Sequence, residues 1–346
     1  MGRDDGRVTK RSVRGTRDVG RVVEPARVPR PASHVPANAT WVGPLALLTA
    51  ALIWGFVPTS TRHVVQTLSP GNILLARFLV GAVAAVILLW GFRAPLPPKE
   101  LIPRAIMLGL LGQLGFNVPL AYGIQHVEAG TAALISGLSS VFIAALAVPL
   151  LGERLYARVV IGLVLALSGS VLVTIMSGGE LSLSRDQAVG SILILTSATL
   201  WAVYSVIVKP WLGKIPPTSI PMLGSIAGLP LMLPIGVSGL TSGLSDLAWT
   251  GWLGVAQFTI TASVIAPILW AVGLQRGEAS RAGLYLYLTP LFGVIISAVL
   301  LGEPITIGTI IGGGLIVAGV VIATLPSVGR RGSTPRSTSQ AAGNDV

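Results

Sequence analysis

Charged side chains are scarce in this sequence. Asp, Glu, Lys and Arg make up 11% of the 346 residues, whereas 52% of the residues are hydrophobic. A soluble domain carries roughly 25% charged residues, and the mean hydropathy of this chain is +0.79. The composition therefore excludes an ordinary soluble enzyme and predicts an integral membrane protein.

Cysteine is absent and histidine is rare. The lack of cysteine excludes disulfides, thiolate nucleophiles and cysteine-bound metal sites. The three histidines, His34, His63 and His126, include no pair spaced i, i+4, as a helical metal site would need. The sequence also has no P-loop, and no acidic residue lies in the middle of a long apolar run. These absences argue against a metalloenzyme, against ATP-driven transport by this chain and against proton coupling through a buried carboxylate, and we expect no cofactor.

The excess of positive charge lies mainly in two polar tails. The net charge is +11; residues 1–40 hold nine basic and four acidic side chains, and residues 326–346 hold three arginines and one aspartate. Neither tail contains a long apolar run, so we expect disordered segments at 1–40 and 329–346. Because the rest of the chain is membrane-like, we expect both tails to lie near anionic lipid on the cytoplasmic side and not to bind nucleic acid.

Between the tails, long apolar runs alternate with short polar breaks. A helix needs about 20 residues to cross a bilayer, and these runs fit helices better than the ~10-residue alternating strands of an outer-membrane barrel. The sequence predicts an all-α integral membrane fold with ten transmembrane helices, at about 43–62, 72–92, 104–124, 129–150, 157–177, 188–208, 218–238, 250–272, 279–300 and 305–325. The seventh run is the weakest, because Pro221, Pro230 and Pro234 interrupt it.

The distribution of Lys and Arg predicts the side of the membrane on which each loop lies, because cytoplasmic loops carry more of these residues. If the N-terminus is cytoplasmic, 21 of the 24 basic residues fall in cytoplasmic segments and two, Arg62 and Arg185, fall in external loops. The remaining one, Arg77, lies inside the second span. Ten spans then place both termini in the cytoplasm, and the expected location is the cell membrane.

The sequence also contains an internal repeat. A shift of 150 residues aligns 129–132 with 279–282 and the Leu-Leu-Gly-Glu at 150–153 with the same residues at 300–303, and a shift of 147 aligns Trp54 with Trp201. Each half, 43–177 and 188–325, contains five spans. Because five is an odd number, the second half enters the membrane from the opposite side, which predicts two inverted five-helix repeats. That architecture recurs among secondary transporters.

Several short motifs carry a family resemblance. They are Trp54-Gly55 in the first span, Ala76-Arg77-Phe78 in the second, the Leu-Gly-Glu ends of the fourth and ninth, and Leu288-Thr289-Pro290-Leu291-Phe292. In order and duplication they resemble the drug/metabolite transporter superfamily, specifically its ten-helix EamA-type members. The resemblance implies a ten-helix bundle around a central substrate cavity and, often, export of amino acids or other small metabolites. The first half has Ser139-Ser140 where the Thr-Pro pair would fall, so we expect the fourth helix to be straighter than the ninth.

Polar residues inside the spans are the candidates for a substrate site, because buried polar groups in a membrane face the bundle interior or a wet cavity. Arg77 is the clearest candidate, although an arginine near the start of a helix can also extend to the lipid headgroups. The third span carries Gln113 and Asn117 and the eighth carries Gln257 and Thr261, each pair spaced i, i+4 on one helix face. Each pair could line a cavity or could join neighbouring helices.

Aromatic residues complete the set of candidates. Trp54 and Trp201 lie at mid-depth, where a buried indole N–H needs an acceptor, and they either line the cavity or pack helices together. The substrate-binding candidates are Trp54, Arg77, Gln113, Asn117, Ser139, Ser140, Trp201, Tyr204, Gln257, Thr261, Trp270, Tyr285 and Thr289.

Two glutamates close the fourth and ninth helices on opposite faces of the membrane, Glu153 and Glu303. A membrane thickness separates them, which excludes a catalytic acid pair. We interpret them as helix caps or, for Glu153, as a partner of Arg154 or Arg158, with a role in gating as the alternative. Glycines recur on the fifth and tenth spans and allow close helix contact, either within the bundle or between the two protomers of a homodimer.

The sequence as a whole predicts a secondary transporter, and not an enzyme, that moves a small molecule by alternating access between its two repeats. The expected partners are a small-molecule substrate, such as an amino acid for export, and membrane lipid. One alternative is an integral-membrane enzyme acting on lipid, for which no nucleophile or acid pair is visible. The other is a channel or membrane scaffold, for which no charged ring or filter is visible.

Overall fold

The computed structural model describes residues 41–61, 64–127, 129–176, 185–302 and 304–325, together with Gly2. The predicted tails at 1–40 and 329–346 lie outside the described residues apart from Gly2. Arg62, Glu128 and Glu303 lie outside them as well.

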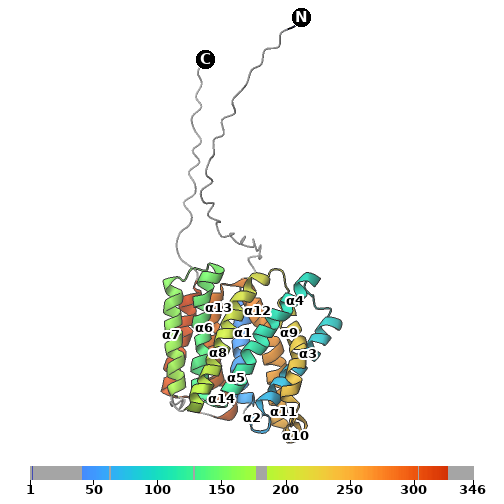
Figure 1. Ribbon diagram of the computed structural model, residues 1–346. Coiled ribbons are helices and arrows are strands. Elements are labelled where there is room, and N and C mark those ends of the chain that lie inside the picture. The colour runs from blue at the N-terminus through green and yellow to red at the C-terminus, as the bar shows by residue number, and fades with distance from the viewer. Residues whose placement is uncertain are drawn as a thin grey trace. The chain divides into compact units, whose positions relative to one another are not determined.

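Within the described ranges, ten helical segments are long and apolar enough to cross a membrane (Figure 1). This finding confirms the all-α fold and the ten predicted spans, including the proline-rich seventh. The uninterrupted spans are α1 (Val42–Thr61), α3 (Pro70–Trp90), α6 (Ala129–Leu151), α7 (Ala157–Met176), α9 (Ser219–Gly236) and α15 (Ile307–Thr324). Two short helices, α2 (Val64–Thr67) and α10 (Leu240–Ser245), connect spans.

The other spans are chains of consecutive helical pieces. The third consists of η2 (Lys99–Leu101), α4 (Ile102–Leu110), η3 (Leu111–Gly115) and α5 (Phe116–Gly123), and the sixth of α8 (Arg185–Val208) and η4 (Lys209–Trp211). The eighth consists of α11 (Trp249–Ala256), η5 (Gln257–Ile265) and α12 (Ala266–Arg276), and the ninth of α13 (Ala279–Leu284), η6 (Tyr285–Tyr287) and α14 (Leu288–Leu301). Of the fourth and ninth helices, α6 is continuous, whereas the ninth span contains the 3₁₀ turn η6.

Helix ends follow local sequence signals. At the start of α3, the Ser69 hydroxyl accepts from the Asn72 backbone N–H (3.2 Å) and Asn72 Oδ1 accepts from the Ser69 backbone N–H (3.1 Å), which forms a capping box ahead of Pro70. The glycines of the two Leu-Gly-Glu motifs both adopt a left-handed conformation, with φ of +65° at Gly152 and +69° at Gly302. Glycine enters this region without a Cβ penalty, so both motifs end their helices in the same way.

The two halves deviate from α-helical geometry at matching places. The segments η3 and η5 are both π-helical, and a shift of 150 residues places 111–115 on 261–265, inside η5. A π-helical insertion releases backbone groups from the regular pattern and is frequent at functional sites. The repeat therefore extends to the local backbone of the third and eighth spans.

Helices α7 and α15 pack against each other through reciprocal glycine contacts. Gly162 lies against Gly319, and Gly169 lies against Gly312. A shift of 150 residues converts 162 into 312 and 169 into 319, so each glycine meets the repeat counterpart of the other. A two-fold axis produces this exchange, and these glycines pack within the bundle. The chain thus consists of two inverted five-helix repeats.

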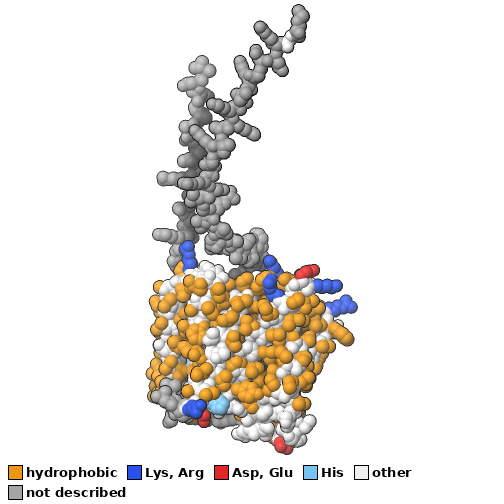
Figure 2. Space-filling model, viewed as in Figure 1, with side chains coloured by type: hydrophobic (Ala, Val, Ile, Leu, Met, Phe, Trp, Pro, Cys, Tyr) orange, Lys and Arg blue, Asp and Glu red, His pale blue; other side chains and the backbone are white. Residues whose placement is uncertain are grey.

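Hydrophobic side chains cover most of the face seen in Figure 2, and the coloured charged side chains lie at its two ends. Large apolar residues such as Val299, Ile307 and Ile310 are mainly exposed. Such exposure would be costly in water but is suited to a lipid environment. We call the end where α1 begins the proximal face; α6, α8 and α12 end there.

Candidate functional site

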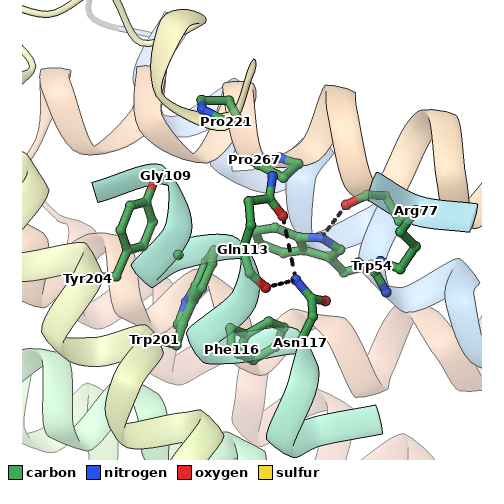
Figure 3. A pocket seen from close by; sticks show the side chains of 12 residues that line it. Trp54, Arg77, Gly109, Gln113, Phe116, Asn117, Trp201, Tyr204, Pro221 and Pro267 are labelled. Atoms are coloured by element: carbon green, nitrogen blue, oxygen red, sulfur yellow. Dashed lines mark hydrogen bonds between the residues drawn. The ribbon is translucent and has the colours of Figure 1, made fainter. Parts of the chain in front are cut away.

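A narrow cavity with about 20 Å³ of free space lies between helices of both repeats (Figure 3). It is lined from the first repeat by Trp54, Arg77, Gly109, Gly112, Gln113, Phe116 and Asn117, and from the second by Trp201, Tyr204, Pro221, Ala262 and Pro267. Six of these were sequence candidates: Trp54, Arg77, Gln113, Asn117, Trp201 and Tyr204. The cavity thus lies between residues separated by more than 200 positions in the chain.

Two tryptophans that correspond by the internal repeat meet beside this cavity. The rings of Trp54 and Trp201 lie edge to face with centroids 5.5 Å apart. Phe116 and Trp270 pack on Trp201 at 4.9 and 5.6 Å, respectively. The Trp54 indole N–H donates to the Ala262 carbonyl oxygen (3.1 Å), which supplies the acceptor that a buried tryptophan needs. Both sequence-based readings of Trp54 therefore apply, because it lines the cavity and also joins α1 to η5.

The polar pair of the third span lies on the cavity wall. Gln113 Nε2 donates to the Ser263 carbonyl oxygen (3.4 Å), and a shift of 150 residues relates these two positions. Asn117 Nδ2 donates to the Gln113 carbonyl oxygen (2.7 Å) and lies 3.5 Å from Gln113 Oε1. Both neighbours are acceptors, so the nitrogen of the Asn117 amide must face them. Asn117 Oδ1 is then left buried without a hydrogen-bond partner.

Arg77 reaches this cavity from α3 (Figure 3). The side chain is partly buried, and among the described residues it has neither an ion pair nor a hydrogen bond. None of the residues that line the cavity is acidic. This position favours the interpretation in which Arg77 lines the cavity over the alternative in which its side chain extends to the lipid headgroups.

Sequence reasoning did not single out the residues that shape the cavity without polar side chains. Gly112 lies under the Tyr204 ring, where an added Cβ would come within 2.8 Å of Tyr204 Cε2. A glycine in a helix, next to a candidate polar residue, is the available sequence signal for such close contact. Phe116 and Pro221 carry no comparable signal, because apolar residues of these types occur throughout the spans.

The polar pair of the eighth span lies outside the cavity lining. Gln257 accepts a hydrogen bond from the Ser60 hydroxyl (2.6 Å) and donates to the Ile53 carbonyl oxygen (3.2 Å), both in α1. The Thr261 hydroxyl donates to the Gln257 carbonyl oxygen (2.6 Å). Of the two uses that the sequence left open for such a pair, joining helices describes the contacts of Gln257.

The remaining candidates also lie outside the cavity lining. The Trp270 indole N–H donates to the Ser205 hydroxyl (3.3 Å), and the Ser140 hydroxyl donates to the Gly283 carbonyl oxygen (2.7 Å). The other three are Ser139, Tyr285 and Thr289. The fourth and ninth spans, which we expected to help line the site, contribute no residue to it. They contact each other instead, through bonds such as that from Ser140.

The Leu-Gly-Glu end of α6 forms a junction between helices at the proximal face. Glu153 Oε1 accepts from Lys209 Nζ (2.8 Å) and from the Ala279 backbone N–H (2.7 Å), and Oε2 accepts from the Ser280 backbone N–H (3.0 Å) and hydroxyl (2.7 Å). The carboxylate therefore caps the N-terminus of α13 and interacts favourably with the positive end of its helix dipole. The cationic partner is Lys209, which tertiary folding brings to α6, whereas we expected Arg154 or Arg158.

The ionisation of Glu153 reflects these contacts. Burial opposes the charged form and by itself would raise the pKa of the carboxyl group. Lys209 and the Ser280 donors oppose this effect, and the net result is a pKa below the ordinary value. Glu153 is therefore charged at neutral pH and holds the proximal ends of α6, η4 and α13 together.

Comparisons with known proteins agree with this architecture. The sequence matches the EamA-like transporter family over residues 41–175 and 188–325, once in each repeat. An uncharacterized transporter of Archaeoglobus fulgidus is 28% identical over 283 residues, which cover 80% of this chain and 97% of that protein. A probable terminal-alkyne amino-acid exporter of Streptantibioticus cattleyicolor is 26% identical over 301 residues, covering 86% and 98%, respectively.

A solved crystal structure supports the fold alone. It has a TM-score of 0.69 and 22% sequence identity, and the match covers 83% of this chain and 96% of that structure. The family match covers most of both repeats, and the ten spans are those that the sequence resemblance implied. The chain belongs to the EamA-like transporter family.

Proposed function

We propose that this protein is a secondary transporter of the cell membrane that moves an amino acid or a similar small organic molecule by alternating access. The observation that carries the proposal is the cavity between the two inverted repeats, lined by Arg77, Gln113 and Asn117 within otherwise apolar spans. A binding site between inverted repeats can be exposed to either side when the repeats rock against each other. Because the relative from Streptantibioticus cattleyicolor is named as a probable amino-acid exporter, we propose export as the direction.

The Glu153 junction supports a gate at the proximal face. It joins the ends of α6, η4 and α13 through one carboxylate, so breaking it would free three elements together. We propose that this junction opens and closes during the transport cycle.

The proposed orientation places the proximal face in the cytoplasm, together with both termini. The charge bias between the loops supports this orientation. Reporter domains fused after Arg154 and after Ser182 are expected to report the cytoplasm and the exterior, respectively. Two reporters in the same compartment would contradict the orientation.

Transport is tested by reconstituting the full chain in liposomes and measuring the flux of labelled amino acids and related metabolites down imposed gradients. We expect saturable flux of at least one compound above that of protein-free liposomes. A matched preparation of the Gly112→Phe variant, whose new side chain must displace the Tyr204 ring in the cavity wall, is expected to lose this flux while its thermal unfolding shows that it is folded. Equal flux with and without protein for every compound would refute the proposal.

A further inference from the structure

Arg77 brings into the cavity a positive charge that no described residue compensates. A guanidinium group donates hydrogen bonds and accepts none, so it requires acceptors, preferably anionic ones. Arg77 has no hydrogen bond or ion pair among the described residues, and the cavity lining contains no Asp or Glu. An unpaired charge within a membrane span is costly and is normally matched by another group. A bound molecule with an anionic group would supply this match.

Asn117 adds a second unpaired group, which is a hydrogen-bond acceptor and not a donor. Its side chain is 4% exposed, and its Oδ1 has no partner. The amide nitrogen of Asn117 donates its hydrogen bond to Gln113. The free Oδ1 of Asn117 can only accept a hydrogen bond. A buried polar atom without a partner costs free energy until a donor is supplied. The residues that line the cavity thus include donors at Arg77 and an unpaired acceptor at Asn117.

The remaining surface of the cavity is largely aromatic. Trp54, Phe116 and Trp201 line it, and no second basic residue does. One guanidinium group balances one negative charge, which fits a carboxylate better than a doubly charged phosphate. The planar fork of arginine also matches the two oxygens of a carboxylate.

From these observations we infer that the transported molecule carries one carboxylate group, which binds Arg77, and a hydrogen-bond donor that faces Asn117 Oδ1. This inference rests on the proposed transport function and names the chemistry of its substrate. A small monocarboxylic acid with a hydrogen-bond donor and an apolar side chain satisfies all three features, and an α-amino acid supplies the carboxylate, the donor and the side chain on one carbon atom. Arg77 then determines specificity for acids over their neutral or cationic analogues.

The test compares each acid with its amide. Full-length protein in liposomes is assayed with leucine, phenylalanine and valine, and with the amide of each. The melting temperature of the detergent-solubilised protein is measured with the same compounds. We expect flux and thermal stabilisation with the acids, and at least about tenfold weaker apparent affinity for the amides. This scale follows from the loss of a hydrogen bond to a charged group.

Variants separate a binding role of Arg77 from a structural one. Arg77→Gln is expected to weaken the apparent affinity for the acids by about tenfold or more, and Arg77→Lys is expected to recover part of it. Since Arg77 has no partner to lose, the melting temperature of ligand-free Arg77→Gln should equal or exceed that of the wild type. Arg104→Gln is the matched control, because Arg104 lies over the Trp211 ring (3.9 Å) outside the cavity, and its transport should be unchanged.

Two outcomes overturn the inference while transport itself stands: amides moved as well as acids, or Arg77→Gln with wild-type affinity. A marked loss of stability in Arg77→Gln with unchanged affinity in the surviving protein would assign Arg77 a structural role and would also overturn it. If no compound in the wider panel is moved or bound by the wild type, the proposed function fails, and this inference fails with it.

Discussion

Replacing Glu153 by glutamine should loosen three helical elements at once. Glutamine has one oxygen and one NH₂ group where the carboxylate has two acceptors. The variant therefore loses the ion pair with Lys209 and turns a donor toward the N–H groups of Ala279 or Ser280, which both need acceptors. The Glu153 side chain is 8% exposed and that of Lys209 21%, so solvent only partly compensates for these losses.

The magnitude follows from the burial of the pair. Removing one partner of a buried ion pair costs about 3–5 kcal/mol. Lys209 also donates to the Gly277 carbonyl oxygen and is partly exposed, so some of its interactions survive in the variant. We expect a loss of about 2–4 kcal/mol, or a fall in melting temperature of roughly 4–8 °C by the scaling of larger domains. Thermal unfolding of purified protein in detergent at neutral pH measures this change.

The effect should also depend on pH. Because the pKa of Glu153 is lowered in the folded protein, its stabilisation is fully present above the ordinary carboxyl pKa and is lost as the pH falls through the lowered value. The difference in stability between wild type and Glu153→Gln should therefore narrow below about pH 4. A difference that stays constant into acid would contradict the assignment of the charge.

Glu278→Gln is the matched control. Glu278 precedes the same helix, α13, and pairs with Arg281 at 2.7 Å, but its side chain is 39% exposed. An exposed pair of this kind contributes only about 0.2–1 kcal/mol. If the melting temperature of Glu153→Gln equals that of Glu278→Gln instead of lying well below it, the reasoning about the junction is refuted.

Two further predictions concern helix packing. Gln257→Ala removes two hydrogen bonds to α1 and should lower the free energy of unfolding by about 1–2 kcal/mol. The apparent KM of a transported substrate should stay at its wild-type value. A raised KM at normal stability would place Gln257 in the substrate site. Gly169→Ala introduces a Cβ that overlaps the backbone of α15, whereas Gly314→Ala meets no atom within 4 Å. The first should lose about 1–3 kcal/mol and the second almost nothing, as measured by unfolding in detergent, and equal effects would contradict the packing of α7 on α15.

The membrane-spanning pattern was determined by the sequence itself. A bilayer requires about 20 apolar residues for each crossing, so ten runs predict ten helices without knowledge of their neighbours. The inverted repeat followed in the same way, because two aligned copies with an odd number of spans must have opposite orientations. The helix-ending role of the Leu-Gly-Glu motifs was also readable, since glycine favours the left-handed position that both motifs adopt.

The identity of the cavity residues was decided only by the tertiary structure. Gln113–Asn117 and Gln257–Thr261 are the same pattern in sequence, yet the first pair lines the cavity and Gln257 of the second binds α1. The i, i+4 spacing specifies that two side chains share a helix face, but the packing of other helices determines what that face meets. For the same reason Glu153 pairs with Lys209, 56 residues away, and not with an adjacent arginine. The contact depends on which helix ends the fold brings together, and no local spacing in the sequence encodes that.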